Sequence, residues 1–266
     1  MDRDRYGGAL AVVTATSSSG PSDTALERFL GSLPAAAARP VPVVVVACGA
    51  PGPEAGPVTL GGDPGHDPGD VRVLRIGEDV GFAAAVNRGV AALDADVGWL
   101  AVASPHVEWG GGTLDALRSA ADRWPRAGAL GPVLRGPSGV IRAGAVPPVG
   151  GALGVALTRV LPDGPPVKGP GEGPVGWLPS ACLLLRRAAF DSVDGFDPRY
   201  RDHLADADLG DRLARAGWLS VRVPTAQAAV PAPPHDPAEL RSAAVRYLND
   251  RVPGPLRPVL RAFLGR

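Results

Sequence analysis

The stretch Pro174 to Trp218 reads PVGWLPSACLLLRRAAFDSVDGFDPRYRDHLADADLGDRLARAGW. Near its beginning, residues 177–185 form a short apolar run that ends at two arginines, which is the length and composition of a buried strand. The segment Asp194 to Pro198 then carries turn residues, because glycine adopts positive φ and proline disfavours helix at the residue before it. We therefore expect a strand that enters the core, followed by a reversal of the chain.

A helix is expected directly after this turn. From Ala205 the apolar residues recur at helical spacing, and aspartate–arginine pairs at i and i+4 lie on the opposite face. These pairs are Asp208 with Arg212 and Asp211 with Arg215. Gly217 is expected to end the helix in a left-handed conformation. Asp206 falls in the first turn, where unpaired N–H groups and the helix dipole favour an anion.

Strands and helices alternate in the earlier part of the chain. The expected strands cover residues 9–14, 41–47, 71–76 and 99–103, and the expected helices cover residues 23–33, 81–93 and 113–124. A hairpin with its turn at Ser138-Gly139 is expected next. This alternation predicts an α/β fold with a Rossmann-like, mostly parallel sheet that is flanked by helices.

The later part of the chain contains a long loop and a tail. Residues 147–174 are rich in glycine and proline, and a loop of this length is expected to be functional or mobile. After the central stretch we expect a strand at residues 221–224, a helix at residues 237–251 and a basic, apolar piece at residues 256–266. The basic, apolar piece either rests on a membrane surface or packs on the domain.

Composition limits the partners and the compartment. The 266 residues have a formal net charge of +0, so no nucleic acid or other polyanion is expected as a partner. The two cysteines, Cys48 and Cys182, lie in apolar runs and are expected to be buried free thiols in a reducing compartment. The sequence has no apolar run of about 18 residues and no signal-peptide core, which predicts a cytoplasmic protein, with peripheral contact at the inner face of the cell membrane left open.

The stretch Pro174 to Trp218 resembles the acceptor half of glycosyltransferase family 2, and three motifs of the chain are similar to rhamnosyltransferases of that family. They are VEWGGGTLDAL at residues 107–117, RWPRAGALGP at residues 123–132 and DLGDRLARAGWLSV at residues 208–221. Where the family has Glu-Asp-Val-Asp-Leu, this chain has Ala-Asp-Ala-Asp-Leu at residues 205–209. Within the family the chain is most similar to cell-wall rhamnosyltransferases that act on polyprenyl-diphospho-N-acetylglucosamine.

The resemblance implies a GT-A fold in a single domain. It places the glycosyltransferase-like domain at residues 1–231, with a nucleotide-binding half at about 9–132 and an acceptor half at about 133–231, followed by a C-terminal helical tail at 232–266. It also implies an inverting transfer of a sugar, with rhamnose as the candidate, from a nucleotide diphosphate donor to a lipid-linked acceptor or another cell-envelope glycan.

For the nucleotide sugar, the resemblance implies binding by residues that follow the expected strands: Thr14, Asp79, Gly81, Asn87 and Ser104. The aspartate that the family has after its second strand is missing, and Cys48 stands close to that place. Gly81 has two interpretations. It either lets a phosphate approach the N–H groups at a helix start, or it is a helix entry packed by Phe82.

For a metal, the family has Asn-Pro-Asp after the fourth strand, and this chain has Ser104-Pro105-His106. Mn or Mg is therefore an implied but weakly supported cofactor, because imidazole binds Mn and Zn and is a poor ligand for Mg. The alternative is that His106 is a solvated loop histidine.

For the acceptor, Asp206 matches the family's catalytic base, which takes the proton of the acceptor hydroxyl. Its alternative role is that of an N-cap residue. The resemblance implies that Trp177 stacks on an acceptor sugar. The alternative is that its side chain packs in the hydrophobic core.

The sequence also supports a second hypothesis of another class. Four charged or metal-ligating residues of the family are replaced in this chain: the aspartate after the second strand, the aspartate after the fourth strand, the first acid of the Glu-Asp pair and a late histidine. The loss of one preorganised electrostatic contact commonly costs about 10²- to 10³-fold in rate. A pseudoenzyme that pairs with or regulates an active glycosyltransferase is therefore the competing hypothesis.

Overall fold

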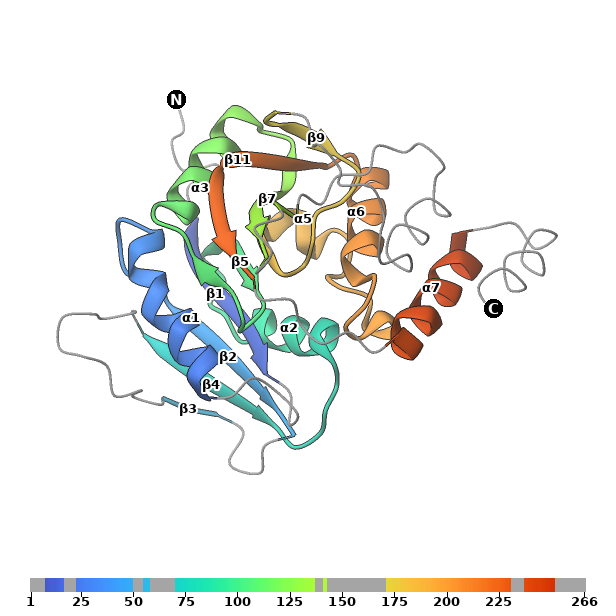
Figure 1. The fold of residues 1–266 in the computed structure, drawn as a ribbon, viewed down its shortest axis with the longest axis horizontal. Helices are drawn as coiled ribbons and strands as arrows, with labels where there is room; N and C mark the ends of the chain where they lie inside the picture. The colour runs from blue at the N-terminus through green and yellow to red at the C-terminus, as the bar shows by residue number, and fades with distance from the viewer. Residues whose placement is uncertain are drawn as a thin grey trace.

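One mixed sheet organises the chain in the computed structural model (Figure 1). The structure describes residues 8–16, 23–49, 55–57, 70–136, 141–142, 171–230 and 237–251. Within these residues the strand order is β3-β4-β2-β1-β5-β10-β7-β11-β6, with β8 paired to β7 and β9 paired to β11. The expected α/β fold with a Rossmann-like sheet is confirmed, but the sheet is mixed: among the described strands four pairings are parallel and six are antiparallel.

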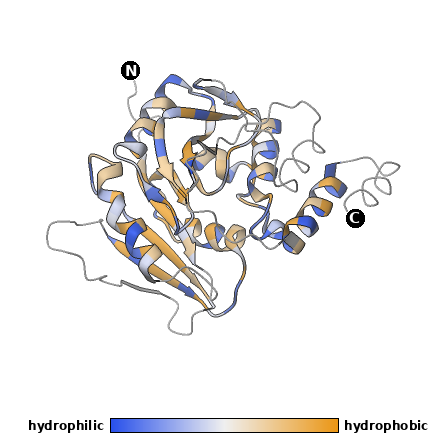
Figure 2. Cartoon of the chain, in the orientation of Figure 1, coloured by the Kyte–Doolittle hydropathy of each residue, from blue (hydrophilic) through white to orange (hydrophobic). Residues whose placement is uncertain are grey.

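The first half of the sheet is built from parallel strands joined by helices. Its strands are β1 (Ala9–Thr16), β2 (Val43–Cys48), β4 (Val71–Ile76) and β5 (Val97–Ala103), with the short β3 (Ala55–Pro57) at the edge. β2 pairs with β1 and β4 in parallel, and β1 pairs with β5 in parallel. Figure 2 shows apolar residues gathered along β1, β2 and β5, as expected for strands covered on both faces.

The second half contains strands of both directions. Its elements are β6 (Glu108–Trp109), β7 (Ala127–Arg135), β8 (Ile141–Arg142), β9 (Gly173–Val175), β10 (Cys182–Arg186) and β11 (Leu219–Ala229). β10 lies between β5 and β7 and is antiparallel to both, whereas β11 runs parallel to β7.

Two strands differ from the expectation by more than two residues at one end. The strand expected at 177–185 begins only at Cys182, after Pro179, because proline cannot donate a ladder hydrogen bond. The strand expected at 221–224 continues to Ala229, and it passes Pro224 through a register shift between Val223 and Gln227.

Helices cover both faces of the sheet. They are α1 (Asp23–Ala36), α2 (Phe82–Ala91), α3 (Thr113–Arg123), α5 (Arg187–Asp191), the 3₁₀ turn η2 (Pro198–Tyr200), α6 (Ala205–Arg215) and α7 (Pro237–Arg251). Buried residues of α1 and α3 share one core cluster. Buried residues of α2, α5, α6 and α7 share another, which contains apolar residues of β5 and β10 that point to the opposite face.

Both ends of α6 are defined by left-handed residues. Leu204, with φ 63°, is the N-cap, so the alternative that made Asp206 the N-cap is wrong. Gly217, with φ 86°, follows the last turn. Its N–H donates to Ala214 O at 3.1 Å and the N–H of Trp218 donates to Leu213 O at 2.9 Å, which is a Schellman motif and confirms the expected helix end.

The charged face of α6 is partly as expected. Asp208 and Arg212 form the expected ion pair at 2.7 Å. Asp211, in contrast, accepts hydrogen bonds from Tyr247 and Arg251 of α7 instead of forming the expected pair with Arg215. The charge that neutralises Asp211 therefore comes from another helix.

The helix expected at residues 237–251 is α7, and it packs on the domain. Its residues Ala243, Ala244, Tyr247 and Leu248 are at most 8% exposed and belong to the same core cluster as Leu204. α7 thus packs against the domain, whereas the two alternatives for the basic piece at 256–266 and the division of the chain after residue 231 stay predictions. The expected turn at 138–139, nearly all of the loop at 147–174 and the end piece at 256–266 lie outside the described residues.

Gly210 allows α6 to approach the segment that precedes β10. A Cβ at Gly210 would lie 2.7 Å from Gly176 O and 2.8 Å from Trp177 Cβ. We expect Gly210→Ala to lower the free energy of unfolding by about 1–3 kcal/mol, because backbone atoms would have to move. Urea unfolding of the purified variant measures this.

A glycine on α1 provides the matched control. An added Cβ at Gly31 would have no atom within 4 Å. Gly31→Ala is expected to raise stability by about 0.5–1 kcal/mol, because alanine reduces the entropy of the unfolded chain. Equal effects of the two substitutions would contradict the close approach at Gly210.

Candidate active site

The carboxyl ends of the parallel strands meet at one edge of the sheet, where α/β folds of this type bind their ligands. The topology brings the loops that follow β1, β2, β4 and β5 together at this edge. β10 begins beside the same edge, since the N–H of Ser104 donates to Ala181 O at 2.9 Å. Most of the residues expected to bind the donor therefore come from neighbouring loops.

Two of the residues at these strand ends are buried. Thr14 is 0% exposed, and its hydroxyl has no hydrogen-bond partner among the described residues. Cys48 is 4% exposed, and burial raises the pKa of its thiol, so the thiol stays neutral at neutral pH. Cys48 and Cys182 are both free and buried, as expected. Thr14 therefore lies inside β1, two residues before the end of the strand, and is covered by other residues.

Residues of the acceptor half cap the N-terminus of α2. The N–H of Phe82 donates to Asp202 Oδ1 at 2.8 Å, and the N–H of Ala83 donates to Arg201 O at 2.9 Å. Gly81 has φ 77°, and a Cβ there would lie 2.9 Å from Arg201 Cβ. The arrangement is that of a packed helix entry. Phosphate binding at Gly81 stays a prediction, and it would require the segment 201–202 to move.

Asp79 and Asn87 form bonds within the chain. Asp79 Oδ1 accepts from the N–H of Gly81 at 3.0 Å and forms an ion pair with Arg201 at 3.4 Å. The amide of Asn87 donates to Phe196 O at 2.7 Å and accepts from the N–H of Phe196 at 3.0 Å. Asp79 and Asn87 therefore hold the segment from Phe196 to Arg201.

His106 is the only side chain that the sequence analysis offered as a metal ligand. The backbone N–H of His106 donates to Ser104 Oγ at 3.4 Å, and burial lowers the pKa of the imidazole, which keeps the ring neutral. Across the described ranges, no group of three or more His, Cys, Asp or Glu side chains could hold a metal ion.

Asp206 lies in the first turn of α6 and is 5% exposed. Its Oδ2 accepts from the N–H of Ser180 at 3.2 Å, and its Oδ1 accepts from the N–H of Ala207 at 2.9 Å. Two backbone donors thus orient the carboxylate at the point where the segment before β10 meets α6.

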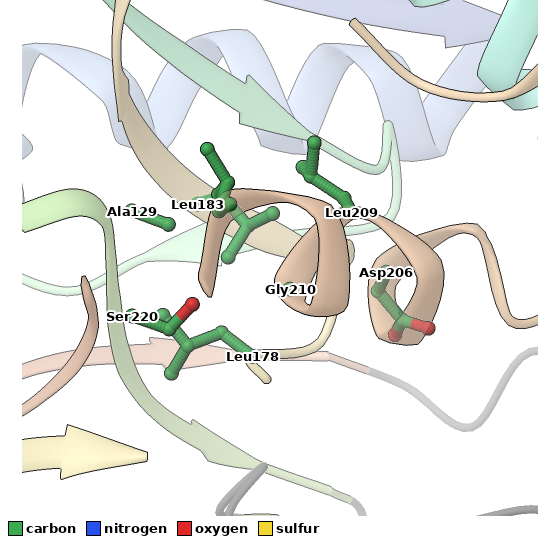
Figure 3. Close-up of a pocket in the computed structure, with 8 residues that line it drawn as sticks. Ala129, Leu178, Leu183, Asp206, Leu209, Gly210 and Ser220 are labelled. Carbon is green, nitrogen blue, oxygen red and sulfur yellow. The ribbon is translucent and has the colours of Figure 1, made fainter. Parts of the chain in front are cut away.

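A small cavity of about 10 Å³ adjoins this residue, and Figure 3 shows Asp206 and Gly210 on successive turns of α6 beside it. The other residues that line it are Ala129, Leu178, Leu183, Leu209, Leu213 and Ser220. Its volume is that of about one water molecule, so it is too small for a sugar.

Trp177 is 7% exposed and belongs to the core cluster beneath α6. This burial fits the alternative of a core aromatic, and stacking on an acceptor sugar stays a prediction. The residues that the sequence analysis missed are Arg201, Asp202 and Arg251. Asp202 and Phe82 are 120 positions apart, so no local sequence signal could have paired them.

Comparison with solved structures defines the class of fold. GalNAc-T7, solved with UDP, GalNAc and Mn²⁺, matches with a TM-score of 0.61 and 13% identity over 91% of this chain, which spans 48% of that protein. The mannosyltransferase PcManGT from Pyrobaculum calidifontis, solved with GDP-Man and Mn²⁺, matches with a TM-score of 0.57 and 16% identity over 98% of this chain and 70% of that protein. The chain has the fold of the GT-A glycosyltransferases.

Sequence comparison defines the family. N-acetylglucosaminyl-diphospho-decaprenol L-rhamnosyltransferase of Mycobacterium tuberculosis is 43% identical over 239 residues, which cover 82% of this chain and 74% of that protein. The O-antigen biosynthesis protein RfbC of Myxococcus xanthus is 41% identical over 109 residues, 39% of this chain and 8% of that protein. No model of a protein family matches the chain. The chain belongs to the same family of rhamnosyltransferases as the mycobacterial protein, which confirms the resemblance drawn from its motifs.

The Asn87 contacts predict a specific loss of stability. We expect Asn87→Ala to lower the free energy of unfolding by about 1–3 kcal/mol, because it leaves the N–H and C=O of Phe196 without their partners. Arg88→Ala on the same helix is the control. It removes only an exposed ion pair with Glu78 and is expected to cost at most about 1 kcal/mol. Thermal and urea unfolding of both variants checks the difference.

Proposed function

We propose that this protein transfers a rhamnosyl group from a nucleotide diphosphate donor to a lipid-linked N-acetylglucosamine acceptor with inversion at the anomeric carbon. The observation that carries the proposal is the identity with the mycobacterial rhamnosyltransferase, which extends over most of the chain. The GT-A fold supports a donor site at the carboxyl edge of the parallel strands.

Asp206 is the proposed general base. Its carboxylate takes the proton of the acceptor hydroxyl while that oxygen forms a bond with the anomeric carbon. The bond between this carbon and the diphosphate oxygen breaks, and the nucleotide diphosphate leaves with the electron pair. The N–H groups of Ser180 and Ala207 orient the carboxylate for this step.

The donor is proposed to lie over the ends of β1, β2, β4 and β5, near Asp79, Asn87 and Ser104. A divalent metal, if bound with the donor, would neutralise diphosphate charge, and His106 is the only ligand proposed for it here. The solved neighbours contain Mn²⁺ together with a nucleotide or nucleotide sugar, which supports a metal at the donor site in general terms.

The acceptor chemistry supports contact with a membrane surface. Among the described residues, no helix is long and apolar enough to cross a bilayer. Because a lipid-linked acceptor is held in a membrane, peripheral contact with the membrane surface is part of the proposal.

Asp206→Asn tests the proposed base. We expect kcat for transfer from nucleotide-diphospho-rhamnose to polyprenyl-diphospho-N-acetylglucosamine to fall by about 10²- to 10⁴-fold, with an unchanged donor dissociation constant, because the amide cannot accept the proton. Product formation measured with radiolabelled donor, and calorimetric titration of donor with and without Mn²⁺, give the two quantities. Asp122→Asn, an exposed position on α3, is the matched control and should keep wild-type kcat.

The same assay decides between the enzyme and the pseudoenzyme. Absence of transfer and of donor binding in the wild-type protein, together with co-purification of another glycosyltransferase, would favour the pseudoenzyme hypothesis. Full activity of Asp206→Asn would exclude Asp206 as the base.

A further inference from the structure

A buried charged contact joins α7 to α6. Arg251 Nη2 donates to Asp208 Oδ1 at 2.6 Å, and Arg251 Nε donates to Asp211 Oδ2. The side chains of Arg251 and Asp208 are only 7% and 6% exposed. Removal of one partner of such a pair leaves an uncompensated buried charge, so the contact strongly favours one position of α7 relative to α6.

Tyrosine hydroxyls extend this contact to the segment before α6. Arg251 Nη1 donates to the hydroxyl of Tyr200 at 3.2 Å, and that hydroxyl donates to Asp250 Oδ2 at 3.0 Å. The hydroxyl of Tyr247 donates to Asp211 Oδ2 at 2.8 Å, and the Arg251 guanidinium lies 3.9 Å from the centre of the Tyr247 ring. α7 therefore contacts the chain on both sides of Asp206.

Asp208 connects this contact to the first turn of α6. Its N–H donates to the carbonyl of the left-handed N-cap Leu204 at 3.0 Å. Its carboxylate is shared between Arg251 and Arg212, and Arg212 also donates to the carbonyl of Gly195 at 2.7 Å. The position of the first turn of α6 thus depends on two guanidinium groups. One belongs to Arg251 of α7, and the other belongs to Arg212, which is bonded to the turn at Gly195.

The backbone before Asp206 needs such support. Arg201 and Leu204 both have positive φ, 46° and 63°, which is unfavourable for residues other than glycine. Conformations of this kind persist where surrounding contacts fix them. Burial lowers the pKa of Arg251, but the hydrogen bonds to Asp208 and Asp211 raise this pKa by more than burial lowers it. Arg251 therefore stays charged.

We propose that α7 is a positioning element of the active site and that Arg251 is the positioning residue through which it fixes the Asp206 carboxylate. The proposal rests on the proposed function, because it assigns Asp206 the role of the base. Arg251 itself touches neither substrate in this assignment. A misplacement of a reacting group by about 1 Å can cost about 10²-fold in rate, so the loss of Arg251 should act on kcat.

The experiment compares Arg251→Ala, Arg251→Lys and the control Arg246→Ala in the full-length chain. Arg246 is exposed on the same helix. We expect Arg251→Ala to lower kcat about 10- to 100-fold with the donor dissociation constant unchanged within twofold, because the donor half does not contact α7 through this residue. Arg251→Lys should recover part of kcat, and millimolar guanidinium should partly rescue Arg251→Ala but have no effect on Arg246→Ala.

Three results would overturn this proposal without affecting the proposed function. One is a wild-type kcat in Arg251→Ala. The second is a fall in donor affinity that matches the fall in kcat, since that would indicate a general loss of folded protein. If Arg251→Ala does not fold, Tyr247→Phe serves as the milder variant, because it removes only the hydroxyl that donates to Asp211. The third result is an unchanged kcat in both Tyr247→Phe and Arg251→Lys.

The failure of the proposed function gives a different result. Absence of transfer by the wild-type protein would overturn the proposed function and, with it, the role of Arg251 in catalysis. Transfer by the wild-type protein with unaffected Arg251 variants would overturn only the role of α7.

Discussion

The insertion of β10 between β5 and β7 is the constraint on which the rest of the structure depends. All five residues of β10 are buried, and the strand pairs along its whole length with β5 and, through Leu184 and Leu185, with β7. The strands on either side of β10 therefore belong to one sheet. The segment just before this strand bonds Ser104 on one side and Asp206 on the other, so the position of β10 sets the separation between the donor edge and the proposed base.

The polar residues of the donor half serve mainly to join the two halves. Asn87 binds the backbone of Phe196, Asp79 pairs with Arg201, and the start of α2 is capped by Asp202. Asp79 and Asn87, which the family resemblance assigns to nucleotide binding, thus form hydrogen bonds or ion pairs with other residues of this chain. A donor site at this edge would rely more on shape and backbone groups than on carboxylates, because Cys48 presents a neutral thiol near the place where the family has an aspartate.

Local patterns predicted local structure well. The strand at 71–76, the helix at 237–251 and the end of α6 at Gly217 follow from apolar spacing, β-branched residues and a glycine with positive φ. The sequence did not predict the late start of β10 or the N-cap at Leu204, since leucine is not a usual capping residue. It also missed the contacts of Asp202 and Arg251, whose partners lie 120 and 43 positions away and are brought together only by the tertiary fold.

The burial of the two native cysteines has a practical consequence for spectroscopy. Cys48 and Cys182 are 4% and 1% exposed, and burial raises the thiol pKa of both, so neither presents a reactive thiolate to a reagent. A cysteine introduced at an exposed position on α3 and another on α7 would therefore accept fluorophores selectively in the otherwise native protein. Energy transfer between such labels would report how far α7 moves from the sheet in solution, without a cysteine-free background having to be made first.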